Sequence, residues 1–240
     1  MKYILIVVIS FLCCPMILHA QDIDSTKVHK NYIGIDPFLP AFGSVQLNYE
    51  RAIFNDVSFG LAVGLKSSSG LFEITEIDFN RFNSENLNFS GIKLIPEIRW
   101  YFQDKKKGLT GIYAGAYYRY QNYSADLKGT YTSVEDEVSN ILIDTNLKSS
   151  TIGLELGYKW QFRNGIYIDL LFAGPGWSSN TFTLTEIEPV PEAFYDDLTD
   201  ALNDIGIIDF VDPDFEVNGN QETTIALPAW RYGIKIGYAF

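Results

Sequence analysis

The residue types that most often carry catalysis are scarce in this 240-residue chain. It holds two cysteines, Cys13 and Cys14, and two histidines, His19 and His29. Three of these four lie in an apolar N-terminal segment that reads as a cleaved leader, so only His29 would remain. A Ser–His or Asp–His hydrolase needs a positioned base, and His29 precedes the first predicted strand. We therefore expect no catalytic residues, no cofactor and no enzymatic activity.

Carboxylates close to basic residues form a second set of candidates. Glu97 lies two positions before Arg99, and Glu155 lies four positions before Lys159. In a strand each pair shares one face, so each could serve as an acid and base. Because an unpaired buried charge is costly, we interpret both sets as structural ion pairs.

A third candidate is a weak calcium site formed by Asp212, Asp214, Glu216 and Asn218, in which oxygen ligands recur at every second position. Calcium prefers several such oxygens. The segment lacks the glycine at position six and the glutamate at position twelve of an EF-hand loop, so no metal is assigned.

Residues 1–20 have the pattern of a secretory signal peptide. Lys2 is followed by an almost wholly apolar run from Tyr3 to Leu18, and the small residue Ala20 marks the predicted cleavage site. Residues 21–30 then form a periplasmic N-terminal segment. The alternatives are a retained membrane anchor and a lipoprotein modified at Cys13 or Cys14, although Ser10-Phe11-Leu12 lacks the expected lipoprotein pattern.

From Asn31 onward, apolar and polar residues alternate with the period of two that is typical of β-strands. In the last strand Trp230, Tyr232 and Ile234 alternate with Arg231 and Gly233. Eight such segments are predicted, at 31–37, 44–54, 57–66, 90–103, 110–124, 148–162, 166–176 and 230–240. Pro96 removes a ladder donor, so we expect a bulge there.

The polar face of these strands does not resemble a surface that faces water. It consists mostly of Gly, Ala and Ser with charges of both signs: Lys66, Lys93, Arg99, Arg119, Lys159, Arg231 and Lys235 against Asp36, Glu50, Glu97, Glu155 and Asp169. Small residues and paired charges suit the inside of a narrow barrel. This favours an inverted arrangement, with the apolar face outside, over a soluble lipocalin-like carrier.

Connection lengths and aromatic residues support the same interpretation. Short turns at 55–56, 104–108 and 163–165 alternate with long segments at 67–89, 125–147 and 177–228, as in outer-membrane barrels. Aromatic residues gather at strand ends in two sets, which would form two membrane-interface girdles: Trp100, Phe102, Trp160, Phe162, Tyr238 and Phe240, and Tyr118, Tyr120, Trp177, Trp230 and Tyr232.

The C-terminal Tyr238-Ala239-Phe240 resembles the sorting signal of outer-membrane β-barrels that the barrel-assembly machinery recognises. Over residues 31–240 the chain resembles the small OmpA/OmpX-like barrel family, without that family's separate periplasmic peptidoglycan-binding domain. The resemblance implies an all-β fold, an eight-stranded antiparallel up-and-down transmembrane β-barrel in the cell outer membrane. It implies no particular activity.

The last long segment is acidic and contains one predicted helix. Residues 177–228 hold twelve acidic residues and no Lys or Arg. Over 191–203 an apolar stripe, continuing to Ile205, has helical spacing, with four aspartates outside it: Phe194, Leu198, Ala201, Leu202 and Ile205, against Asp196, Asp197, Asp200 and Asp204. The helix would either pack on neighbouring loops, which we favour, or cap the lumen or meet a partner.

The formal net charge of −12 disfavours nucleic acid as a partner. We expect a monomeric, non-enzymatic outer-membrane protein whose acidic extracellular loops have a structural or surface-binding role. Its partners would be outer-membrane lipids, the assembly machinery during insertion and an extracellular partner. The alternatives are a narrow ion or small-solute channel and, less favoured, an outer-membrane lipid-modifying enzyme.

Overall fold

The computed structural model describes residues 29–67, 78–79, 81–102, 108–162, 164–204 and 216–240. The predicted signal peptide and most of the segment 21–30 lie outside these residues. The elements in chain order are β1 (Asn31–Ile35), the 3-10 helix η1 (Leu39–Phe42), β2 (Ser44–Ala52), β3 (Val57–Lys66), β4 (Asp78–Phe79), β5 (Phe82–Tyr101), β6 (Gly111–Thr132), β7 (Val138–Gln161), β8 (Ile166–Ala173), β9 (Pro175–Glu186), α2 (Glu192–Asn203), β10 (Glu222–Trp230) and β11 (Gly233–Ala239).

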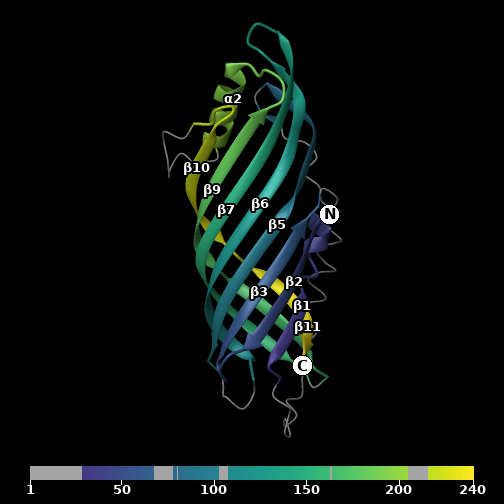
Figure 1. The fold of residues 1–240 in the computed structure, drawn as a ribbon, viewed down its shortest axis with the longest axis vertical. Helices are drawn as coiled ribbons and strands as arrows, with labels where there is room; N and C mark the ends of the chain where they lie inside the picture. Colours follow the sequence, from purple (N-terminus) through teal and green to yellow (C-terminus); the bar gives the residue numbers. More distant parts are fainter. Residues whose placement is uncertain (1–28, 68–77, 80, 103–107, 163, 205–215) are drawn as a thin grey trace, which may run out of the picture.

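Eight antiparallel strands close into a barrel (Figure 1). β8 and β9 are two parts of one strand, interrupted at Gly174, and β10 and β11 are two parts of another, interrupted at Arg231 and Tyr232. β1 pairs with β11, with Ile33 opposite Tyr238, so the first strand meets the last. The predicted all-β, eight-stranded antiparallel barrel with one short helix is confirmed.

The predicted assignment of the two strand faces is also correct. On β2, Val45 and Leu47 are 60% and 50% exposed, whereas the intervening Gln46 is 5% exposed. On β7, Leu154 is 65% exposed and Glu155 is 2% exposed. The apolar face therefore lies outside and the polar face lines the lumen. Nearly all of the aromatic residues expected in the two girdles are exposed, and the ring of Tyr120 is half-buried.

The prediction of long loops at 67–89, 125–147 and 177–228 is largely wrong, because strands extend into all three segments. β5, β6 and β7 have 20, 22 and 24 residues, and β6 and β7 are joined by the turn 133–137 rather than by a loop over 125–147. Asp136 adopts a positive φ of 62° in this turn. We call the end of the barrel that holds the β2–β3 turn at 53–56 and Phe240 the turn end, and the opposite end the loop end.

The outward face changes character toward the loop end, which explains why the pattern there did not predict strands. Low on β6 the outward residues are apolar, as at Ile112 and Tyr118. Farther up they are charged and exposed, as at Asp126 and Lys128. Over the same stretch the inward face becomes apolar, with Leu127 8% exposed. The pattern is thus inverted along one continuous strand.

Beyond the closed barrel, β5, β6, β7, β9 and β10 rise above β1, β2 and β3 and carry α2 at their far end (Figure 1). β3 pairs with β5 only from Gly91 to Trp100. The strands above that level form an open curved sheet, which we call the extension. No helix in the described ranges is long and apolar enough to cross a membrane.

The bulge expected at Pro96 is absent. Pro96 lies opposite Leu61 of β3, and the β5–β6 ladder keeps one register on either side of it, from Leu94 opposite Tyr120 to Glu97 opposite Tyr117. The missing backbone N–H of Pro96 therefore interrupts the β5–β6 pairing without changing its register. The register shift of β5 lies between Ser84 and Asn86, in the extension.

Candidate functional site in the lumen

A network of eight charged side chains fills the lumen toward the turn end. Each is at most 8% exposed. Four are carboxylates and four are cations, so their formal charges cancel: Glu50, Glu97, Glu155 and Asp169 with Arg99, Lys159, Arg231 and Lys235. We call this set the ion network. Charged side chains are tolerated in a buried position when each is paired with a charge of opposite sign.

Arg99 on β5 is the centre of the ion network. Its Nε lies 2.8 Å from Glu155 Oε1, and its Nη2 lies 2.8 Å from Glu97 Oε1. Its Nη1 lies 2.6 Å from Asp169 Oδ2 and 3.5 Å from Glu50 Oε2. One planar guanidinium thus contacts all four carboxylates, which its fixed fork of donors allows.

Arg231 and Lys235 complete the ion network on the side facing the loop end. Arg231 Nη1 lies 2.9 Å from Glu97 Oε2 and 2.8 Å from Glu155 Oε2. Lys235 Nζ lies 3.0 Å from Glu97 Oε1. Glu97 of β5 and Glu155 of β7 are therefore both linked across the lumen to the C-terminal strand β10–β11.

Lys159 lies at the turn end of the ion network, enclosed by aromatic rings. Its ammonium pairs with Glu50 and lies 4.3 Å from the ring centroid of Tyr32. The rings of Tyr101 and Tyr167 lie 5.3 and 5.2 Å away. Ring faces attract a desolvated cation, so these tyrosines both stabilise Lys159 and close the lumen below it.

Lumen glycines provide the space for these rings. A Cβ atom added at Gly157 would lie 2.3 Å from the Tyr113 hydroxyl, and one added at Gly34 would lie 2.2 Å from the Tyr167 hydroxyl. Sequence reasoning predicted small residues in the lumen but missed the tyrosines as its filling. Their signal was present, because they occur in the polar phase of their strands.

The two carboxylate–base sets predicted from sequence have different outcomes. Glu97 and Arg99 form the predicted ion pair. The pairing of Glu155 with Lys159 is wrong, since Glu155 pairs with Arg99 and Arg231 while Lys159 pairs with Glu50. The reason is register: Arg99 lies opposite Gly115, which in turn lies opposite Glu155, so Arg99 reaches across a residue without a side chain.

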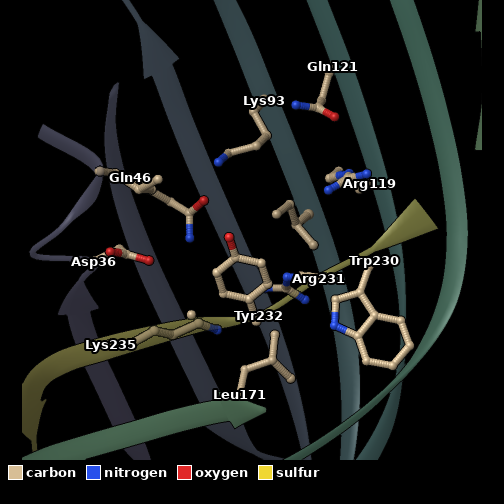
Figure 2. Close-up of a pocket in the computed structure, with 13 residues that line it drawn as sticks. Asp36, Gln46, Lys93, Arg119, Gln121, Leu171, Trp230, Arg231, Tyr232 and Lys235 are labelled. Carbon is tan, nitrogen blue, oxygen red and sulfur yellow. The ribbon is translucent and has the colours of Figure 1, made fainter. Parts of the chain in front are cut away.

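A cavity of about 150 Å³ lies above the ion network, toward the loop end (Figure 2). Gln46, Lys93 and Arg119 enter it from β2, β5 and β6, with Arg231 and Lys235 on its other side. A larger cavity of about 410 Å³ adjoins it and shares Arg119, Gln121 and Trp230 as lining residues. Sequence analysis placed these cations in the lumen without singling out a cavity.

The extension has a separate apolar core, formed between its concave face and α2. Phe194 of α2 is fully buried and lies 5.3 Å from the ring centroid of Phe82 and 5.7 Å from that of Tyr131. Residues of β5, β6, β7, β9 and β10 surround it: Phe82, Ala125, Leu127, Tyr131, Ile141, Ile143, Leu184 and Ile225. The favoured prediction was that this helix packs on neighbouring loops; it does pack on its neighbours, but these are strands of the extension.

The sequence predicted Asp197 to lie outside the apolar stripe of the helix, but in the structure it is buried. It is 8% exposed, accepts hydrogen bonds from Arg81 at 2.9–3.1 Å and from the Tyr131 hydroxyl at 2.7 Å. Burial and the hydrogen bond to Asp197 raise the pKa of Tyr131 above its usual value. Burial and the hydrogen bond to Glu186 likewise raise the pKa of Tyr195.

The remaining candidates are the calcium site and His29. Asp212 and Asp214 of the calcium candidate are outside the described residues, and Glu216 and Asn218 are exposed. Within the described ranges no group of three acidic, His or Cys side chains could hold a metal ion. His29 lies at the turn end, near the β2–β3 turn, beside a shallow pocket that includes Asn55.

Comparison of the chain with protein-family models, with curated proteins and with solved structures finds no match.

Proposed function

We propose that this protein is a monomeric, non-enzymatic bacterial outer-membrane barrel of the OmpA/OmpX-like kind, exported by residues 1–20 and presenting the extension outside the cell. The observation that carries this proposal is the inversion of the outward face. Apolar residues cover the closed barrel, and charged residues cover the extension. Exposing the apolar surface of the closed barrel to water would be costly. A protein that crosses a bilayer needs that apolar surface in the lipid and the charged surface of the extension in water.

Strand lengths support the same placement. β2 and β3 have nine and ten residues, and a tilted transmembrane strand needs about 9–11. β6 and β7 exceed that length by more than ten residues each. At about 3.4 Å per residue, the extension would project some tens of ångströms beyond the lipid headgroups.

A binding role for the extension rests on its charge. Its exposed acidic residues greatly outnumber Lys128 and Lys148 on the same strands: Asp126, Glu135, Asp136, Glu137, Asp144, Glu188, Glu192, Asp196, Asp200, Asp204, Glu216 and Glu222. Such a surface attracts cations and basic partners and repels anionic ones at low salt. We infer that the partner presents positive charge.

Conduction is disfavoured by the ion network. Eight charged side chains and the tyrosines around Lys159 occupy the cross-section of the lumen toward the turn end, as is usual for eight strands. Purified protein in a planar bilayer should therefore give no reproducible current steps. Steps that change on Arg99 substitution would favour the channel alternative.

The test of the membrane placement combines flotation with gel mobility. Wild-type protein refolded with phospholipid vesicles should float with them and migrate faster unheated than boiled. Leu154→Asp, which places a charge on the outward face of the closed barrel, should reduce insertion. Asn140→Asp on the outward face of the extension should not. Wild-type protein that stays in the aqueous fraction would refute the proposal.

A further inference from the structure

Two cations in the lumen stand outside the balance of the ion network. Lys93 and Arg119 both line the 150 Å³ cavity. In the described part of the chain no carboxylate lies within ion-pair distance of either side chain. Arg119 donates to Thr151 Oγ1 at 3.2 Å, and its buried Nε has no partner.

This excess of positive charge is unexplained by the fold. The ion network is neutral without Lys93 and Arg119, so neither is needed to compensate a buried carboxylate. Among the described residues Asp36 is the single acidic one that lines the cavity, and its Oδ1 accepts the Phe38 backbone N–H. Lys93 and Arg119 are half-buried, and a partly desolvated cation without a counter-ion is costly; an anion in the cavity would reduce that cost.

The cavity has the size and donors for such an anion. Its volume of about 150 Å³ far exceeds the roughly 10–15 Å³ that one water needs by this kind of measure. Gln46 and Gln121 line the cavity beside the two cations. Their Nε2 atoms donate to Asn48 Oδ1 and to the Tyr123 hydroxyl, which leaves each amide one further N–H for a ligand. Gln46, Gly64, Lys93 and Gln121 lie in one cross-strand row, so glycine leaves room between Gln46 and Lys93.

The adjoining 410 Å³ cavity continues this space along an apolar wall. Leu147, Phe182, Leu227 and Trp230 line it beside polar residues. Because the two cavities share Arg119 and Trp230, a ligand could place a charged group at the cations and an apolar chain along this wall. A free inorganic anion would use the first cavity alone.

The barrel wall is incomplete beside these cavities. Within the described residues β10 pairs with β9 alone, so its other edge has no strand partner. Leu39 of η1 lines the smaller cavity together with Trp230 and Tyr232, which are 59% and 79% exposed. Apolar and aromatic side chains thus lead from the outer surface of the barrel to Lys93 and Arg119.

We propose that this pair of cavities binds an anionic amphiphile, a molecule with a phosphate or carboxylate group and an apolar chain, which enters sideways between β10 and η1. Lys93 and Arg119 hold the anionic group through charge-assisted hydrogen bonds, Gln46 and Gln121 contribute amides, and the chain lies against Leu227 and Trp230. The lateral entry rests on the proposed membrane placement, since the amphiphile comes from the surrounding lipid layer.

The test uses Trp230 as a local probe. In a variant whose other tryptophans are replaced by Phe, a chain-brominated fatty acid is titrated into the folded protein in nonionic detergent, and quenching of Trp230 fluorescence is followed. Lys93→Gln with Arg119→Gln should raise the half-quenching concentration by about tenfold or more, because two charge-assisted contacts are lost. Lys93→Arg should preserve binding. The matched control, Lys128→Gln with Lys148→Gln, removes two exposed cations and should change nothing.

Two further ligands identify what the cavities recognise. The methyl ester of the same brominated acid should quench weakly and equally in all variants, because it has no charge. Inorganic phosphate should compete poorly. If the Lys93 and Arg119 double variant binds as tightly as its parent, or if phosphate binds as well as the fatty acid, the proposal is wrong. A protein that floats with vesicles yet shows this result refutes the amphiphile site alone, whereas failure to float refutes the membrane placement.

Discussion

Removing the centre of the ion network should destabilise the barrel more than removing any other lumen cation. Arg99→Met keeps an unbranched apolar stem but removes the guanidinium, and it leaves four carboxylates with three cations. Glu50, Glu97 and Glu155 each retain another basic partner. Asp169 loses its ion-pair partner within the described residues and keeps the hydrogen bond from Tyr113.

The expected loss is therefore that of one buried carboxylate deprived of its partner. Removing one member of a buried ion pair costs about 3–5 kcal/mol. Arg99→Met should lower the free energy of unfolding by that amount. Adding Asp169→Asn removes the stranded charge and should recover about 0.5–3 kcal/mol, the usual coupling between contacting residues. Arg119→Met, at a lumen cation without a carboxylate partner, should change it by less than about 1 kcal/mol.

Urea unfolding in phospholipid vesicles, followed by tryptophan fluorescence and by gel mobility of unheated samples, measures these differences. The double-mutant cycle separates the lost pair from any general loss of packing, since Arg99 also lies 4.3 Å from the Tyr113 ring centroid. Equal losses in Arg99→Met and Arg119→Met would refute the argument from charge balance. So would a double variant less stable than Arg99→Met.

Three further predictions concern packing and the extension. Gly157→Ala should cost about 1–3 kcal/mol, because the added methyl would lie 2.3 Å from the Tyr113 hydroxyl; an unchanged urea midpoint would contradict the packing described. Asp197→Asn removes the ion pair to Arg81, which is 36% exposed, and should loosen α2 by about 1 kcal/mol or less; limited proteolysis should detect this while the gel mobility of the barrel stays unchanged. The raised pKa of Tyr131 stabilises the folded state below the usual tyrosine pKa of about 10, and this contribution is lost as pH rises through the raised value. Protease sensitivity of α2 should therefore increase at strongly alkaline pH, and an identical profile in Tyr131→Phe would show that another group is responsible.

The sequence predicted the strands of the closed barrel because their two faces differ so strongly. On β3, for example, Phe59, Leu61 and Val63 alternate with Gly60, Ala62 and Gly64, so the phase is unambiguous. The same criterion failed above Asn122 on β6, where the outward residues become polar and the inward ones apolar. A search for one constant alternation therefore ended these strands too early, because the strands continue where the alternation inverts.

The partners within the ion network could not be predicted, because they depend on register between strands. Glu155 and Lys159 share a face of β7, which suggested a pair. Arg99 instead reaches Glu155 across Gly115, and this requires knowing which residues lie opposite each other. The helix was predicted within one residue of its start, since Pro191 and the apolar spacing are local signals. Burial of Asp197 depends on Arg81, more than a hundred positions away.

Closure of the barrel also has a kinetic consequence. Asn31 and Phe240, which are 209 positions apart, exchange backbone hydrogen bonds where the first strand meets the last. Contacts of such long range form slowly. The ion network draws on β2, β5, β7, β8 and β11, so its full set of pairs exists only after that meeting. Interactions that form after the rate-limiting step slow unfolding without speeding folding. We therefore expect the buried charges to set how long a closed barrel persists, and strand pairing to set how fast it closes.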